Sequence, residues 1–203
     1  MNFKNVLDRV FSQPTKVKLL RFLLEADPGM TGRELSRFCK ISHMQVYRCL
    51  SDLEEQGIVR RTNVGKSYQY SLNKNNLVVK KLLRTLFETE NGLLEKILKE
   101  LLNGISGTMY SSILFGSALE GKERPTSDVD IFILAKGKKE QTHLKDKLSD
   151  IEIEFYEQTG NRLSPLVLTP EEIKNNHNKL LFSEILSGKL LTGRPIKEFL
   201  YGK

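Results

Sequence analysis

The chain has 203 residues, of which 39% are apolar and 28% charged, a composition typical of a folded soluble protein rather than a disordered one. No apolar run approaches the roughly 18 residues that a membrane span requires, and the N-terminal segment lacks the apolar core of a signal peptide. We therefore expect a cytoplasmic protein that does not bind membranes.

The net charge of +7 is distributed unevenly along the chain. Residues 1–75 carry 13 basic and 7 acidic side chains, whereas residues 76–203 carry 19 and 18. A basic excess confined to the first third indicates a polyanionic partner for that part of the chain. The two cysteines, Cys39 and Cys49, are too few for a disulfide framework or a zinc site, and we expect both to be buried.

Two helix starts lie close together in the basic third of the chain. Thr31 is followed by Glu34, and Ser42 by Gln45, and both pairs have the spacing of a capping box. Gly57 is expected to end the second helix, whose inward stripe comprises Val46, Leu50 and Leu53. Residues 58–72 then have the pattern of a β-hairpin with a basic tip.

This order of helix, turn, helix and hairpin resembles the winged helix-turn-helix domain of bacterial and archaeal repressors. The resemblance covers about residues 12–73, and it is carried by TGRELSRFCKISHMQVYRCLSDLEEQGIVRR and TNVGKSYQYSL. It implies that the helix beginning at Ser42 lies in the major groove of double-stranded DNA and that the hairpin follows the DNA backbone.

The candidate DNA contacts lie off the inward stripe of that helix. Because Gln can pair with adenine and Arg with guanine, we expect side chains of the helix to face bases. The amides at the helix start and the basic residues of the hairpin are expected to contact phosphates. Tyr47 could either contact DNA or pack against the domain, and the sequence does not decide between these two roles. The candidate DNA-binding residues are Ser42, His43, Gln45, Arg48, Arg60, Arg61 and Lys66.

Residues 76–104 are predicted to form a helical connector with a break or kink at Asn91–Gly92. A long helix after the wing is where related repressors dimerise, so we expect a homodimer. The alternative is that the connector packs on the C-terminal domain. Its two apolar stripes are Leu82, Leu83, Leu86 and Phe87, and then Leu94, Ile97, Leu98, Leu101 and Leu102.

A second motif combines Gly116 and Ser117, at the end of one apolar run, with Asp128 and Asp130, at the start of the next. Alternation along a strand places both carboxylates on one face, where a cation would relieve their repulsion. Oxygen ligands of this kind suit Mg²⁺ or Mn²⁺. Glycine lets backbone approach closely, and amides at a helix start can hold phosphate.

The stretch GSALEGKERPTSDVDIFIL resembles the minimal nucleotidyltransferases of the DNA polymerase beta superfamily. With LSPLVLTPEEI and ILSGKLLTGRPI, the resemblance covers about residues 105–196. It implies that Asp128 and Asp130 are catalytic and hold divalent ions, and that a nucleoside triphosphate is the cofactor. The candidate nucleotide-binding residues are Gly116, Ser117 and Ser127.

The sequence departs from this family at the third catalytic carboxylate, because the later predicted strand, residues 163–169, contains no Asp or Glu. Residues 151–155 could supply Glu152 or Glu154 from a strand, but their spacing favours a helix that ends at Gly160. Loss of such an element commonly slows a reaction roughly a thousandfold, so nucleotide binding is favoured over fast turnover.

A second departure is Glu120, which places negative charge near the expected phosphate site, with Lys122 or Arg124 able to compensate.

The predicted fold class is α+β. It comprises a winged helix-turn-helix (1–75), a helical connector (76–104) and a nucleotidyltransferase-like domain with a small mixed sheet flanked by helices (105–203). We expect a transcriptional regulator that binds a metal–nucleotide complex as a sensor. One alternative is an active nucleotidyltransferase that transfers a nucleoside monophosphate to a protein or small-molecule hydroxyl, as an antitoxin would. The other is a degenerate domain that serves as a dimerisation scaffold.

Overall fold

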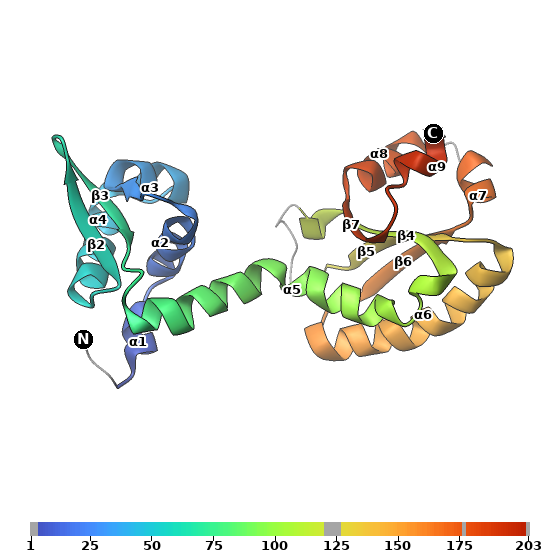
Figure 1. Cartoon of the computed structure of the whole chain (residues 1–203), viewed down its shortest axis with the longest axis horizontal. Coiled ribbons are helices and arrows are strands. Elements are labelled where there is room, and N and C mark those ends of the chain that lie inside the picture. The colour runs from blue at the N-terminus through green and yellow to red at the C-terminus, as the bar shows by residue number, and fades with distance from the viewer. Residues whose placement is uncertain (1–3, 120–126, 176–177, 202–203) are drawn as a thin grey trace. The chain divides into compact units, whose positions relative to one another are not determined.

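The computed structural model describes residues 4–119, 127–175 and 178–201, and it divides into an N-terminal unit, Met1–Asn91, and a C-terminal unit, Gly92–Lys203. Figure 1 shows the elements of both units. Among the described residues, no helix is both long and apolar enough to cross a membrane.

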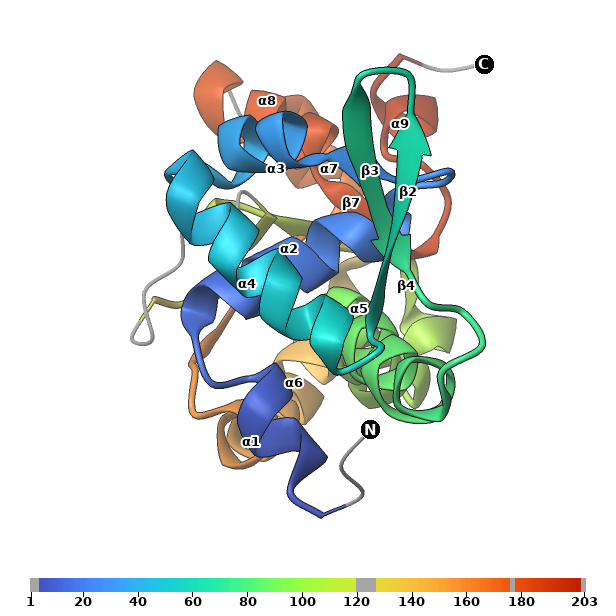
Figure 2. The ribbon, with the colours of Figure 1, turned by 90° about the vertical axis from the view of Figure 1, so that its left-hand side faces the viewer.

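The N-terminal unit is a winged helix-turn-helix, as predicted. Its three strands form an antiparallel sheet in the order β1-β3-β2, and Figure 2 shows β2 and β3 extending as a wing beside α4. The elements are α1 (Val6–Val10), α2 (Pro14–Glu25), β1 (Met30–Thr31), α3 (Gly32–Cys39), α4 (His43–Glu55), β2 (Val59–Val64) and β3 (Ser67–Leu72).

One of the two predicted capping boxes is complete. The Thr31 hydroxyl accepts from the Glu34 amide, and the Glu34 carboxylate accepts from the Thr31 amide. At the start of α4, Ser42 accepts from the Gln45 amide, but the side-chain amide of Gln45 donates to Thr15 on α2. The second capping box is therefore incomplete, because the Gln45 side chain does not bond back to the Ser42 amide. It instead donates to the Thr15 hydroxyl on α2, 2.8 Å away.

The predicted inward stripe of α4 is confirmed, since Val46, Leu50 and Leu53 are fully buried. Both cysteines are also buried, as expected. Gly57 follows α4 with a φ of +71°, a left-handed conformation that glycine adopts without a steric penalty. Packing against α2 and the wing fixes the face that α4 leaves exposed.

The connector is one continuous helix, and the predicted break at Asn91–Gly92 is wrong. A π-helical turn, η1 (Val79–Leu83), leads into α5 (Arg84–Asn103). Leu83 and Phe87 belong to the hydrophobic core of the N-terminal unit, and Leu98 and Leu102 to that of the C-terminal unit. The burial of these side chains outweighs the roughly 1 kcal/mol that glycine costs inside a helix.

The C-terminal unit holds a four-stranded mixed sheet in the order β6-β5-β4-β7, in which only the β5–β6 pair is parallel. Helices cover both faces, as predicted. The described elements after α5 are η2 (Ser106–Thr108), β4 (Met109–Phe115), η3 (Ser117–Leu119), β5 (Val129–Ala135), α6 (Lys138–Thr159), β6 (Leu163–Leu168), α7 (Pro170–Asn175), α8 (Lys179–Ser187), β7 (Lys189–Gly193) and α9 (Lys197–Tyr201).

The two faces of this sheet carry separate cores. Ile131 and Ile133 of β5 pack with α6 on one face. Phe132 and Leu134 point to the opposite face and pack with side chains of α7 and α8. Strand alternation therefore assigns Asp130 to the face that α7 and α8 cover.

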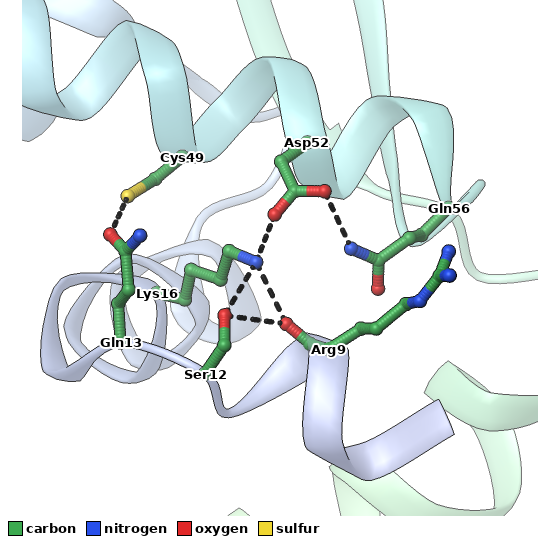
Figure 3. A network of polar contacts seen from close by, with 7 residues as sticks. All are labelled: Arg9, Ser12, Gln13, Lys16, Cys49, Asp52 and Gln56. Carbon is green, nitrogen blue, oxygen red and sulfur yellow. Dashed lines mark hydrogen bonds and ion pairs between the residues drawn. The ribbon is translucent and has the colours of Figure 1, made fainter. Parts of the chain in front are cut away.

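A buried lysine joins three helices of the N-terminal unit. The Lys16 side chain on α2 is 2% exposed, and its ammonium donates to the Arg9 carbonyl of α1 at 2.7 Å and to Ser12 at 2.9 Å. Its third donor goes to the carboxylate of Asp52 on α4 (Figure 3). All three donors of the ammonium are therefore used inside the protein.

We expect Asp52→Asn to destabilise the N-terminal unit by roughly 2–4 kcal/mol, because it leaves the buried charge of Lys16 without its counter-ion. Denaturant unfolding at neutral pH measures the change. The matched control is Asp27→Asn, which removes an ion pair with Lys74 in which both side chains are exposed. That control should cost at most about 1 kcal/mol. Equal effects of the two substitutions would contradict the assigned role of Lys16.

Candidate functional site

The predicted DNA-contacting residues of α4 lie on its exposed side. Ser42, His43, Gln45 and Arg48 are all exposed, on the helix flanks left free by the buried stripe. Gln45 is partly committed, because one of its two amide hydrogens is used by Thr15. The side chains of His43 and Arg48 are accessible to a ligand.

Tyr47 is packed on one side and exposed on the other. A Cβ on Gly32 would lie 2.9 Å from the Tyr47 ring, so glycine at position 32 makes room for that ring. The ring also stacks on His43 and meets the edge of Tyr70, with centroids 6.5 and 6.4 Å apart. Tyr47 therefore holds His43 and the wing beside the exposed surface of α4.

Met44 is an exposed side chain of this surface that the sequence analysis did not select. It is 66% exposed, although methionine is more often a core residue. Its exposure could have been predicted, because position 44 lies off the buried stripe formed by Val46, Leu50 and Leu53. An exposed apolar side chain here could contact the methyl group of thymine.

The structure separates the two arginines of the wing. Arg61 lies 3.3 Å from a Glu54 carboxylate oxygen, and its guanidinium stacks over the Tyr68 ring. Arg60 instead lines a cavity of about 230 Å³ at the base of the wing, because successive side chains of a strand point to opposite faces. Lys66 is exposed at the tip of the wing. Arg61 and Arg60 are therefore not brought together as one cluster.

In the C-terminal unit, Gly116 and Asp130 are in close contact. Gly116 directly follows β4 and has a φ of +78°, and a Cβ there would lie 2.6 Å from Asp130 Oδ2. Only glycine lets the carboxylate approach the chain so closely while the backbone turns. Ser117 follows at the start of η3, the position at which the sequence predicts phosphate binding.

The Asp130 carboxylate lies among like charges. Burial raises its pKa above the ordinary value, a hydrogen bond with Ser164 opposes that shift, and the charges of Asp128 and Glu184 reinforce it. Asp128 is exposed just before β5, and Glu184 comes from α8. Two carboxylates whose charges raise the pKa of a third create an environment that a cation would stabilise.

The position opposite Asp130 on the neighbouring strand holds a serine. Ser164 of β6 is the register partner of Asp130, and β6 contains no acidic residue, as predicted. Residues 151–155 belong to α6, which confirms the helix, and α6 covers the other face of the sheet. Glu152 and Glu154 are therefore excluded as replacements for the third carboxylate.

The sequence also places Ser127, Glu120, Lys122 and Arg124 near this site. Ser127 lies beside the carboxylates, where its carbonyl accepts from the Asn161 side chain at 3.1 Å. Glu120, Lys122 and Arg124 fall outside the described residues.

The donor set fits a divalent ion that is also held by nucleotide phosphates. Asp128 and Asp130 supply hard oxygen ligands. Among residues 4–119, 127–175 and 178–201, no group of three or more His, Cys, Asp or Glu side chains is placed to hold a metal by itself. Mg²⁺ commonly uses one or two carboxylates together with substrate phosphates, so two carboxylates suffice for binding.

Family models match both units. A nucleotidyltransferase domain model matches residues 93–189, and a winged helix-turn-helix DNA-binding model matches residues 13–60. A curated protein of Methanocaldococcus jannaschii, provisionally named a protein adenylyltransferase, is 30% identical over 99 residues. That alignment covers 48% of this chain and 67% of the relative.

Two solved structures also resemble part of the chain. The transcriptional repressor BigR from Xylella fastidiosa is 24% identical, with a TM-score of 0.35, over 40% of this chain and 79% of its own. HlyU from Vibrio cholerae is 20% identical, with a TM-score of 0.36, over 41% of this chain and 85% of its own.

Proposed function

We propose a regulatory function for this chain, which belongs to the nucleotidyltransferase domain family and carries a winged helix-turn-helix DNA-binding domain at its N-terminal end. It would bind double-stranded DNA through α4 and the wing, and bind a metal–nucleotide complex in the C-terminal unit as a sensor. The observation that carries this proposal is Ser164, which stands opposite Asp130 on β6, the strand on which the resemblance predicts a third carboxylate and which contains no acidic residue.

The residues of the C-terminal unit have distinct roles in this proposal. Gly116 and Ser117 would present backbone amides to the phosphates, because the chain turns there without a bulky side chain. Asp128 and Asp130 would hold the divalent ion, which when bound neutralises phosphate charge. Ser164 holds Asp130 by a hydrogen bond but cannot accept the proton of an attacking hydroxyl as readily as a carboxylate.

A second candidate is an active nucleotidyltransferase. It is favoured by the name of the Methanocaldococcus jannaschii relative and by the presence of Glu184 near Asp130. In this reading Glu184 would replace the missing acid of β6. The remaining alternative is that the C-terminal unit binds no nucleotide and serves as a dimerisation scaffold.

Titration with each nucleoside triphosphate in the presence of Mg²⁺ tests the proposed site by calorimetry. We expect saturable binding that requires Mg²⁺ and that Asp128→Ala or Asp130→Ala weakens at least about tenfold, because each variant removes an oxygen ligand. Asp150→Ala is the matched control, an exposed acid on α6. Absence of binding by every nucleotide to the wild-type chain would leave the scaffold reading.

Replacing Ser164 by aspartate distinguishes sensing from transfer. The variant restores a carboxylate at the register partner of Asp130, and we expect it to raise transfer of an α-labelled nucleotide up to roughly a thousandfold. Label is counted on candidate acceptor proteins, with Ser164→Ala as the control. Rapid transfer by the wild-type chain, lost in Glu184→Gln, would instead favour the active enzyme.

We also propose that the N-terminal unit pairs with a second copy. Leu77, Leu82 and Leu86 are between 44% and 62% exposed at the start of the connector, although their neighbours Leu83 and Phe87 are buried. An exposed leucine row of this kind is typical of an interaction surface. A dimer would also suit DNA with two half-sites.

The double substitution Leu82→Glu with Leu86→Glu should therefore convert a dimer into a monomer, as measured by sedimentation. Ile153→Glu, an equally exposed apolar residue on α6, is the control and should leave the mass unchanged. A wild-type chain that is monomeric at every concentration would contradict the pairing.

A further inference from the structure

We propose that a cavity between the start of α2 and the helix α4 binds a phosphate of the DNA backbone, with Arg48 and Gln13 as its donors. The inference rests on the proposed DNA binding and assigns Arg48 to a phosphate rather than to guanine. Gln13 was not among the residues selected from the sequence.

The cavity lies on the exposed side of α4. Its volume is about 410 Å³, and it is lined from α4 by Met44, Arg48, Cys49 and Asp52, and from the start of α2 by Gln13 and Lys16. Met44 and Arg48 are both exposed. A ligand that covers the outer side of α4 would therefore also cover the mouth of the cavity.

The acidic side chain of the cavity does not repel an anion, because its charge is balanced internally. Burial raises the pKa of Asp52, but the hydrogen bonds from Lys16 and Gln56 and the charges of Lys16 and Arg9 outweigh that effect and lower it. Asp52 is therefore ionised and paired with Lys16 (Figure 3). The pair adds no net charge to the cavity.

Arg48 then gives the cavity its positive charge. In the part of the chain that the structure describes, its guanidinium makes no ion pair or hydrogen bond. A free guanidinium offers five N–H donors, in a fork that matches two oxygens of a phosphate. Lys16 cannot compete for this role, since all of its donors are used.

Gln13 is oriented to donate. The Cys49 thiol donates to the Gln13 side-chain oxygen at 3.3 Å, so the amide nitrogen is left for a ligand (Figure 3). Gln13 also precedes Pro14 at the start of α2 and makes no side-chain capping bond there. The positive end of the α2 dipole therefore adds to the charge of Arg48.

These groups define the chemical class of the ligand. A guanidinium and an amide nitrogen are both donors, so they fit an anion that only accepts hydrogen bonds, such as a phosphodiester. The DNA backbone is the source to which we assign it, because Arg48 and Met44 belong to the surface that would face the duplex.

The test measures the salt dependence of binding to a mixed-sequence DNA duplex by fluorescence anisotropy. Loss of one phosphate contact lowers the slope of log K against log salt by about 0.9. We expect that change in Arg48→Gln, together with a roughly tenfold loss of affinity at low salt. Gln13→Ala should lower affinity without changing the slope, because glutamine is neutral.

The matched control is Arg84→Gln, which removes an exposed arginine outside this cavity and should leave the slope unchanged. Circular dichroism checks that each variant is folded. A wild-type chain that binds no duplex would refute the proposed function itself. A wild-type chain that binds DNA, with Arg48→Gln keeping the full slope or losing affinity only for one preferred sequence, would overturn the phosphate assignment alone.

A separate titration with inorganic phosphate, followed by the side-chain amide resonances of Gln13, distinguishes a free anion from the duplex. Resonance shifts that Arg48→Gln abolishes, alongside the reduced DNA slope, support the assignment. Resonance shifts with an unchanged DNA slope would make the cavity a site for free anions and overturn it.

Discussion

The long helix α5 contributes side chains to two hydrophobic cores. Leu83 and Phe87 complete the core beneath the winged helix, and Leu98 and Leu102 complete the core on one face of the mixed sheet. Neither core is closed without its part of this connector, so removal of either stripe would expose apolar side chains that the unit now buries. The connector is therefore part of both units rather than a linker between them.

Polar contacts reinforce the same helix on each unit. Arg21 of α2 forms a two-point ion pair with Glu90, at 2.9 and 2.5 Å. Lys189 of β7 donates to Glu95 at 2.5 Å. Exposed pairs such as these contribute little stability singly. These pairs instead orient α5, because they fix its rotation about its own axis within each unit.

The two candidate sites have opposite chemistry. The surface of α4 gathers donors around Arg48, and Asp52, the carboxylate among the described residues that line the cavity, is neutralised by a buried lysine. The site at the end of β4 gathers acceptors, where Asp128 and Glu184 raise the pKa of Asp130. Both suit phosphate ligands, the first directly and the second through a cation. In the proposed function, the chain would therefore bind DNA and a metal–nucleotide complex at two chemically distinct sites.

Local signals predicted most of the fold. Thr31 and Glu34, three residues apart, form the predicted capping box, and residues 58–72 form the predicted hairpin of the wing. Both could be predicted because caps and turns depend on residues that are neighbours in the sequence. The continuity of α5 at Gly92 was missed because it depends on burial by residues far along the chain. The hydrogen bond between Gln45 and Thr15 also depends on tertiary packing, because the two residues are far apart in the sequence and no local pattern indicates the contact.

The candidate sites were likewise predictable where a local motif marks them and not where they depend on tertiary packing. Gly116 and Asp130 were selected from the sequence as parts of one motif, but their direct contact follows from the strand pairing of β4 and β5. The roles of Ser164 and Glu184 required the strand register and the packing of α8. Gln13 required the cavity, because nothing in its own segment marks it as a donor.

Gly92 occupies a distinctive place in α5. A Cβ at that position would meet nothing within 4 Å, whereas the turns on either side are packed into a core. Its turn is therefore held by backbone hydrogen bonds and by the exposed ion pairs of Glu90 and Glu95 on either side, without a side chain of its own. Such a segment opens locally at a small fraction of the global unfolding free energy. Its amides should exchange with deuterium first within the helix, and a protease added to the native chain should find its earliest cleavage point there.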